Sequence, residues 1–170
     1  LSCHSVLQVL PSDQNLPSLD TTCQEMIIMI EGLPYSDTIK VRFRDLDAQG
    51  HLYFANYLVY ADEVLGTYME KLGLDIMDSL NTQCLIFTVN LQCEYLNEIL
   101  GGSEVAVSVG YNRLGKSSAD AIFEIYDADS GDLMSKGSFT QVFVDPKTRK
   151  SMLIPGFYRD IVLKNQPYIA

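Results

Sequence analysis

Apolar and polar residues alternate strictly along the segment that begins at Thr38. Successive side chains of a strand point to opposite faces, so a period of two predicts a strand with one buried and one exposed face. The apolar face would pack into the core and the cationic face would meet water. The two faces comprise Ile39, Val41 and Phe43 on one side and Lys40, Arg42 and Arg44 on the other.

The period changes to three and four residues over positions 56–72. This spacing predicts an amphipathic helix with one apolar face. Gly73 is placed to end the helix, because glycine readily adopts the left-handed conformation found after helix C-termini. The apolar face would consist of Tyr57, Ala61, Val64, Leu65, Tyr68, Met69 and Leu72.

Four long segments with strand character follow, at residues 84–96, 103–113, 117–128 and 132–145. The links between them are short and rich in turn-forming residues, which favours an antiparallel meander because parallel strands need long crossovers. The concave apolar face of a curved sheet needs cover, and the long helix can supply it. The sequence therefore predicts an α+β fold in which a curved antiparallel sheet of about five strands wraps around one long helix.

A chain of 170 residues is most simply one domain. Its first 35 residues differ from the rest, since they are polar and loop-like apart from one short apolar run. We interpret residues 1–35 as an N-terminal extension and residues 36–165 as the main domain. The apolar run could be a strand or helical turn that covers the main domain, or part of a contact with a partner.

The composition excludes several classes of protein. Apolar residues make up 47% and charged residues 20%, and no apolar run reaches the length of a bilayer span, so a globular protein without a membrane span is expected. The net charge of −10 argues against nucleic-acid binding, which needs cations to displace counterions from phosphates. An anionic ligand would have to be held by local groups.

The four cysteines form no C-x-x-C pair, and only two histidines are present to complete a zinc set. The sequence therefore predicts no metal site and no bound cofactor. So few cysteines in a domain of this size favour reduced thiols, as in a reducing compartment. Residues 1–39 contain no lysine or arginine and so lack the basic region of a secretory signal, which makes the cytoplasm the expected location.

The segment 45–51 has the pattern D-x-D-x-x-G-H, and an Asn-Tyr pair and the amphipathic helix follow it. This pattern, with its flanking strand, its aromatic residues and the order of elements, resembles the 4-hydroxybenzoyl-CoA thioesterase type of hotdog-fold acyl-CoA thioesterases. The resemblance extends over residues 36 to about 165. It implies hydrolysis of an acyl-CoA thioester to a free acid and coenzyme A.

The resemblance assigns the catalytic carboxylate to Asp47, which could attack the thioester as a nucleophile or activate water as a general base. The backbone amide of Phe54 corresponds to the oxyanion donor of the family. Gly50 would allow a tight turn close to the ligand. His51 could orient the carbonyl group or a water molecule, or could be hydrogen-bonded scaffolding. Asp47 could also simply cap the loop.

Other positions match the family less specifically. Asn56 is expected to cap the helix and Tyr57 to line the substrate site, while Asp62 stands where some family members contact polar substrate groups. Asp45 is expected to pair with Arg42 or Arg44 as surface charge.

The turn containing Arg113, Lys116 and Ser117 resembles the coenzyme-binding turn of the family, although cations at a hairpin can also serve solubility. Coenzyme A would enter only as part of the substrate. The family further implies a homodimer or homotetramer in which Asp47 faces the coenzyme turn and the strand near Thr88 and Asn90 of a second chain. Coenzyme A is favoured over an acyl carrier protein, which is itself acidic.

Two other functions are compatible with the sequence. A non-catalytic module could bind acyl thioesters without turning them over. A hotdog hydratase or dehydratase would also act on acyl thioesters, but it would need a histidine and acid pair in motifs that this chain lacks, since its histidines are His4 and His51.

Overall fold

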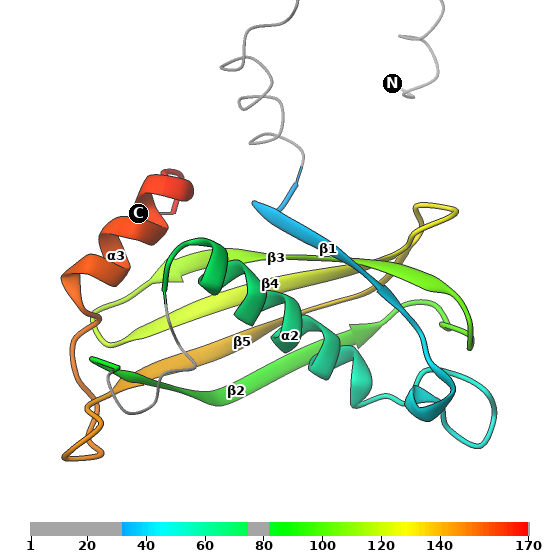
Figure 1. Cartoon of the computed structure of the whole chain (residues 1–170), viewed down its shortest axis with the longest axis horizontal. Coiled ribbons are helices and arrows are strands. Elements are labelled where there is room, and N and C mark those ends of the chain that lie inside the picture. The colour runs from blue at the N-terminus through cyan, green and yellow to red at the C-terminus, as the bar shows by residue number, and fades with distance from the viewer. Residues whose placement is uncertain (1–31, 75–81, 170) are drawn as a thin grey trace, which may run out of the picture. The chain divides into compact units, whose positions relative to one another are not determined.

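The computed structural model describes residues 32–74 and 82–169, so most of the predicted extension, residues 1–31, lies outside the described residues. The described chain forms five strands, two α-helices and a short 3-10 helix (Figure 1). In chain order they are β1 (Tyr35–Lys40), η2 (Phe43–Asp45), α2 (Asn56–Lys71), β2 (Leu85–Tyr95), β3 (Glu104–Leu114), β4 (Ser118–Asp127), β5 (Leu133–Val144) and α3 (Gly156–Asn165).

The five strands form one antiparallel sheet in the order β1-β3-β4-β5-β2. Strands β3, β4 and β5 follow the predicted meander, but the expectation that β2 joins it next to β3 is wrong. β2 pairs with β5 at the outer edge. Three strand spacings of about 4.8 Å separate β2 from β3, a distance that residues 96–103 can cross.

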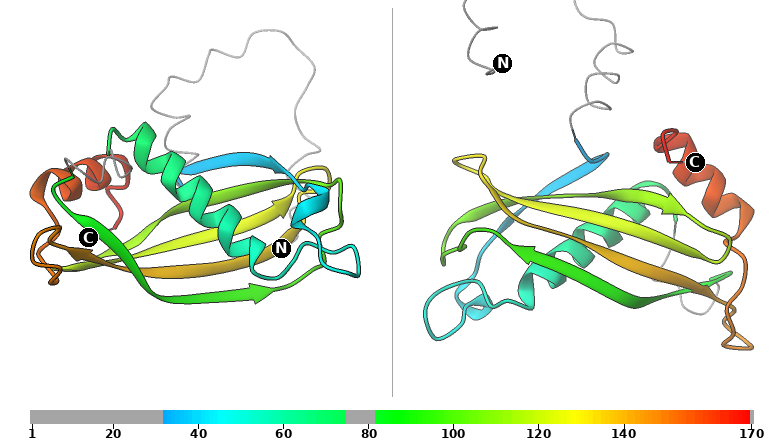
Figure 2. Two further views of the ribbon diagram at one scale, coloured as in Figure 1. Left: turned by 60° about the horizontal axis from the view of Figure 1, so that its bottom comes forward. Right: turned by 180° about the vertical axis from the view of Figure 1, so that it is seen from behind.

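Helix α2 lies across one face of the sheet (Figures 1 and 2). Its predicted apolar face is confirmed, and the helix ends within one residue of the predicted position. Full burial of each large apolar side chain contributes about 1.5–3 kcal/mol, so this face anchors the helix firmly. The buried residues of α2 are Tyr57, Tyr60, Ala61, Val64, Leu65, Tyr68 and Met69, and those of β3 include Val105, Val107 and Val109.

The first strand is shorter than its alternating pattern predicts. β1 ends at Lys40, and Val41 is still buried, but the Phe43 side chain is 92% exposed instead of buried. The chain leaves the sheet here because the Asp45 carboxylate accepts a hydrogen bond from the Arg42 N–H and closes the short helix η2. This local bond overrides the period-two pattern.

The prediction of one long helix is incomplete, because α3 forms a second helix near the C-terminus. Gln166, which follows α3, is fully buried and fixes it to the sheet. Its side-chain oxygen accepts a bond of 3.0 Å from the Tyr111 N–H, and its side-chain nitrogen donates one of 2.9 Å to the Tyr111 carbonyl. Beyond the start of β1, β3 has no neighbouring strand on this side, so the backbone groups of Tyr111 lack a strand partner. The Gln166 amide supplies that partner.

Two cysteines lie in the described chain, and both are free thiols: Cys84 is buried and Cys93 is half-buried. Neither described helix is both long and apolar enough to cross a bilayer.

Gly137 allows close packing in the middle of β5. It pairs with Cys93 of β2 and with Phe123 of β4, and an added methyl group would meet the Gln92 carbonyl oxygen and the Phe123 ring. We therefore expect Gly137→Ala to lower the free energy of unfolding by about 2–3 kcal/mol, measured by denaturant unfolding.

The matched control is Gly156→Ala at the start of α3, where an added methyl group meets nothing within 4 Å. Its unfolding free energy should stay the same or rise by up to about 1 kcal/mol, since alanine favours helices over glycine. Equal effects of the two substitutions would contradict the packing argument.

Candidate active site

A tight loop carries Asp47 and is held by its own backbone. The Asp47 Oδ1 atom accepts hydrogen bonds from the N–H groups of Gln49, at 2.8 Å, and His51, at 3.1 Å. The Asp47 N–H donates to the His51 carbonyl at 2.8 Å, and Gly50 closes the turn with a φ of 85°. That conformation is easy only for glycine. Among the described residues, no donor contacts the second oxygen, Oδ2, so the loop holds one carboxylate oxygen and leaves the other available.

The Asp45 side chain, two residues earlier, is buried and joins the loop to α2. Its Oδ2 atom accepts bonds from the Arg42 N–H and Nε, each at 3.0 Å, and from the Tyr60 hydroxyl at 2.8 Å. Burial by itself raises the pKa of Asp45, but the hydrogen bonds from Tyr60 and Arg42 hold it below the ordinary value. Burial and the bond to Asp45 raise the pKa of Tyr60 well above its ordinary value, so the hydroxyl remains a donor.

The pairing of Asp45 with Arg42 is therefore confirmed, but Asp45 is a buried group and not the expected surface charge. The expected capping role of Asn56 is wrong. Asn56 is the first residue of α2, and its side-chain amide donates at 2.8 Å to the Asp45 carbonyl instead of accepting a bond from the helix. This amide ties the start of the helix to the loop.

Asp47 lines a cavity of about 410 Å³ together with three other residues that the sequence singles out: His51, Phe54 and Tyr57. The Phe54 ring is largely exposed, but its backbone N–H stands just before the N-terminus of α2 and has no hydrogen-bond acceptor among the described residues. A free N–H beside the positive end of a helix dipole can stabilise an oxyanion. The cavity thus combines a free carboxylate oxygen with a free backbone donor.

The remaining wall of this cavity comes from the end of β2 and the residues that follow it. Tyr95, Asn97 and Glu98 were not predicted as site residues. The Tyr95 hydroxyl donates to the Phe54 carbonyl at 2.9 Å, and the His51 Nε2 atom lies 3.1 Å from the Glu98 Oε2 atom. Nothing in the local sequence indicates these neighbours, because they follow from the position of β2 at the sheet edge.

A second cavity, of about 590 Å³, lies between the C-terminal half of α2, the start of β2 and the start of α3. Asp62 and Thr88 line this cavity, so within one chain they are separate from the Asp47 cavity. Asp62 is exposed at the surface, yet the partial burial of its carboxyl group raises its pKa. Asn90 is exposed on β2 and lines neither cavity.

The turn proposed for coenzyme binding joins β3 to β4. Arg113 is engaged in it, with its Nε atom 2.5 Å from the Asp120 Oδ2 atom and a further bond to the Ser118 hydroxyl at 3.3 Å. The Lys116 side chain is exposed and that of Ser117 is half-buried. The structure therefore brings Asp47, His51, Phe54 and Tyr57 together but separates them from this turn within one chain.

No group of three or more His, Cys, Asp or Glu side chains is placed to hold a metal ion in residues 32–74 and 82–169.

The solved structures that resemble this chain share its fold. A thioesterase from Thermus thermophilus, in complex with coenzyme A and Zn, aligns with a TM-score of 0.72 and 26% identity and covers 83% of this chain and all of its own. A 1,4-dihydroxy-2-naphthoyl-CoA thioesterase from Synechocystis aligns with a TM-score of 0.70 at 16% identity, covering 75% of this chain and 94% of its own. The expected sheet and its central helix are thus those of a thioesterase-like hotdog fold.

The family comparison is more specific. The Thioesterase-like superfamily matches residues 41–162, and the chain belongs to this superfamily. A 1,4-dihydroxy-2-naphthoyl-CoA hydrolase of Thermosynechococcus vestitus is 26% identical over 116 residues, which cover 68% of this chain and 79% of the relative. The uncharacterized protein YsmA of Bacillus subtilis is 30% identical over 84 residues, which cover 49% of this chain and only 55% of YsmA. The predicted class, a thioester hydrolase, is confirmed.

The Asp45 network should make stability depend on pH in a definite direction. The folded pKa of Asp45 is lowered, so its contribution is complete above the unfolded value of about 3.9 and is lost as the pH falls through the folded value. We expect Asp45→Asn to lower the free energy of unfolding by about 2 kcal/mol at pH 7 and by less as the pH falls below about 4. Denaturant unfolding across pH 2–7 measures this.

Tyr60→Phe is the companion variant, because it removes only one donor to the carboxylate. The free energy of unfolding should fall less in this variant, by about 1 kcal/mol, since Arg42 still donates to the carboxylate. If Asp45→Asn lowers the free energy of unfolding by the same amount at every pH, the carboxylate charge is not the stabilising feature.

Proposed function

We propose that the protein hydrolyses an acyl-CoA thioester to the free acid and coenzyme A, with Asp47 as the catalytic carboxylate. The observation that carries this proposal is the cavity in which a free oxygen of Asp47 and the free N–H of Phe54 are combined. Membership in the superfamily and the coenzyme A complex of the Thermus relative support the substrate class.

Two routes use these groups. In one, an Asp47 oxygen attacks the thioester carbonyl, the thiolate of coenzyme A leaves, and water cleaves the resulting anhydride to regenerate the carboxylate. In the other, Asp47 takes a proton from water as the water attacks, and the tetrahedral intermediate then expels the thiolate, which is protonated. In both routes the carbonyl oxygen becomes negative, and the Phe54 N–H would donate to it. His51, held beside Glu98, would position the carbonyl or the water.

We further propose that the active site is completed by a second copy of the chain, paired along β2. This strand is one edge of the sheet and exposes apolar side chains along its length, on both of its faces, which isolated edge strands avoid. Antiparallel pairing of two β2 strands about a two-fold axis would cover them. The exposed side chains are Phe87, Val89, Leu91 and Tyr95.

Such pairing would also bring the Asp47 cavity of one chain next to the larger cavity of the other. Because the two β2 strands would run in opposite directions, the Tyr95 end of one would approach the Thr88 end of the other. The Asp47 cavity of one chain would then open toward the larger cavity of the second chain. The acyl group would bind there, with Asp62 and Thr88 as contacts and Asn90 near the axis.

The first test is Asp47→Asn, assayed by release of free thiol from short, long, branched and aromatic acyl-CoA esters. The Asn oxygen can still accept the two loop N–H groups, so the fold should hold while kcat/KM falls by about 10²–10⁴. Melting temperature and binding of acyl-CoA should change little.

Asp127→Asn is the matched control, because the Asp127 Oδ1 atom also accepts two backbone N–H groups, at 3.1 and 2.8 Å, in a turn outside both cavities. Its kcat/KM should equal that of the wild type. Retained turnover in Asp47→Asn would assign Asp47 to the scaffold, and binding without turnover in the wild type would indicate a non-catalytic module.

The second test is Leu91→Lys in the middle of β2, where the side chain is 49% exposed. A lysine would be tolerated by an isolated edge but would place two like charges near the proposed axis. We expect a monomer by sedimentation and at least about a tenfold loss of kcat/KM, because each site would lose its second half.

Leu153→Lys is the control, because Leu153 is 69% exposed but lies outside β2. It should sediment as the wild type does. If both variants sediment alike and keep full activity, the proposed pairing along β2 is wrong.

A further inference from the structure

The cationic side chains of this acidic protein are distributed unevenly. The chain has 12 lysines and arginines against 22 carboxylates. Four of the cations form ion pairs: Arg42 and Arg44 with Asp45, Arg113 with Asp120 and Lys136 with Glu94. Three others gather in residues 145–150, which we call the basic loop. Among the described residues, no carboxylate forms an ion pair with Lys147, Arg149 or Lys150.

The basic loop has a fixed backbone. The Asp145 Oδ1 atom accepts bonds from the N–H groups of Lys147, at 3.0 Å, and Thr148, at 2.6 Å. The Arg149 N–H donates to the Asp145 carbonyl, and the Asp145 N–H donates to the Lys150 carbonyl, both at 2.9 Å. Bonds from the Thr148 backbone, above all, lower the pKa of Asp145, so its carboxylate stays charged. The three cations still outnumber this one anion.

Arg149 also has an uncommon backbone conformation. Its φ is 59°, and no other non-glycine residue in the described chain has a positive φ. Such a conformation has a cost of about 1–3 kcal/mol, and such residues cluster at ligand sites. The turn bonds around Asp145 hold Arg149 in this conformation and so direct its side chain.

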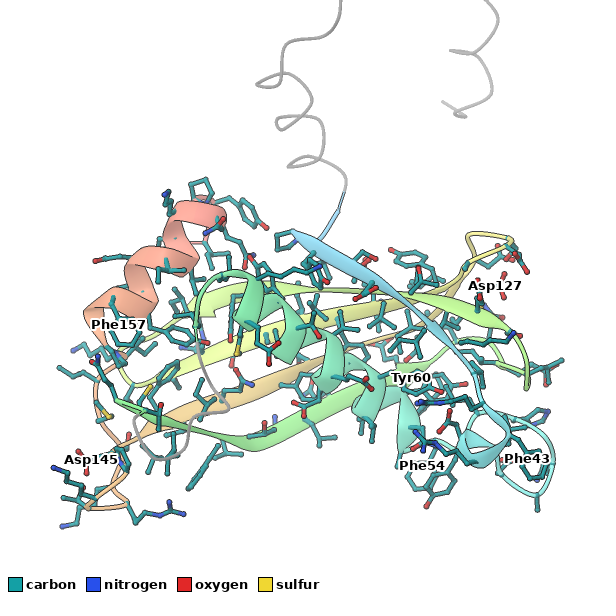
Figure 3. All side chains as sticks on the ribbon, viewed as in Figure 1. Phe43, Phe54, Tyr60, Asp127, Asp145 and Phe157 are labelled. Atoms are coloured by element: carbon teal, nitrogen blue, oxygen red, sulfur yellow. The ribbon has the colours of Figure 1, made fainter. Side chains whose placement is uncertain are left out.

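The basic loop lies beside the larger cavity. The Arg149 guanidinium stands 5.1 Å from the centre of the Phe87 ring, and Phe87 lines that cavity. Figure 3 shows Asp145 at the same end of the sheet as Phe157, which also lines the cavity. The Lys116 turn is close in the fold, because its carbonyl accepts a bond of 2.8 Å from the Ile154 N–H, just after the loop.

We propose that the basic loop binds the phosphate groups of coenzyme A while the acyl group occupies the larger cavity past Phe87. This inference rests on the proposed thioesterase function. Arginine binds phosphate oxygens in pairs and lysines act as point charges, so Arg149 with Lys147 and Lys150 matches a ligand that has a diphosphate and a ribose phosphate. A carrier-bound phosphopantetheine has one phosphodiester only, and the loop therefore selects for coenzyme A over a carrier protein.

The experiment is titration calorimetry of coenzyme A, 3′-dephospho-coenzyme A and pantetheine. The test variant is Arg149→Gln/Lys150→Gln, and the control variant is Lys40→Gln/Lys164→Gln, in which two other lysines without a carboxylate partner lose their charge. Both variants have the same net charge. We expect the Kd for coenzyme A to rise about tenfold or more in the test variant and less than about twofold in the control. The Kd for pantetheine should not change.

The difference in Kd between the wild type and the test variant should be smaller for 3′-dephospho-coenzyme A than for coenzyme A. If the affinity for coenzyme A falls equally in the test and control variants, the effect comes from net charge and the proposal is overturned. The absence of any loss in the test variant, or of coenzyme A binding in the wild type, would overturn it as well.

Hydrolysis of an acyl-pantetheine thioester, which has no phosphate, separates this proposal from the proposed function. The test variant should hydrolyse it with the kcat and KM of the wild type but should show a raised KM for acyl-CoA. If both proteins hydrolyse both esters equally well, the role of the loop is wrong and the thioesterase function stands. If no thioester is hydrolysed but coenzyme A binding depends on the loop, the function is wrong and the loop assignment stands.

Discussion

The buried carboxylate of Asp45 is the constraint on which the Asp47 cavity depends. A buried charge must be paired and hydrogen-bonded to be tolerated, and here Arg42 and Tyr60 meet that need. The backbone carbonyl of Asp45 also accepts bonds from the Asn56 side chain and from the Tyr53 N–H. One residue thus joins the segment that follows β1, the Asp47 loop and the first turns of α2. The Asp47 loop cannot move relative to the N-terminus of α2 without breaking these bonds, which is the preorganisation that the proposed oxyanion donor would require.

The sequence predicts the parts of this arrangement that depend on local periodicity. The apolar spacing of α2 and the strand character of β3, β4 and β5 follow from side-chain direction alone, and the structure confirms them. The pattern fails at Phe43, where alternation continues but the chain turns away from the sheet. The bond that turns it involves Asp45, whose burial depends on Tyr60, a residue fifteen positions later. A local pattern cannot contain that information.

The position of β2 could not be predicted for a related reason. Tight turns fix the neighbours of β4, but the longer link after β2 allows it to reach the far edge of the sheet. This one topological choice decides which residues surround Asp47. It brings Tyr95 and Glu98 to His51 and Phe54, and it places Thr88 with Asp62 in the other cavity. The motif around Asp47 therefore predicted the class of enzyme, whereas the rest of the cavity wall required the fold.

The acidic surface and the basic loop act over different distances. At physiological ionic strength, charges in solvent are screened beyond about 8 Å, so a phosphate held at the loop interacts mainly with the nearest side chains. A polyanion or an acidic carrier protein would cover a larger area and meet the carboxylates that give the chain its net charge of −10. The same charge distribution that permits a small phosphorylated ligand therefore opposes a large anionic one. Selectivity for coenzyme A would then come as much from the acidic remainder of the surface as from Arg149 and its neighbours.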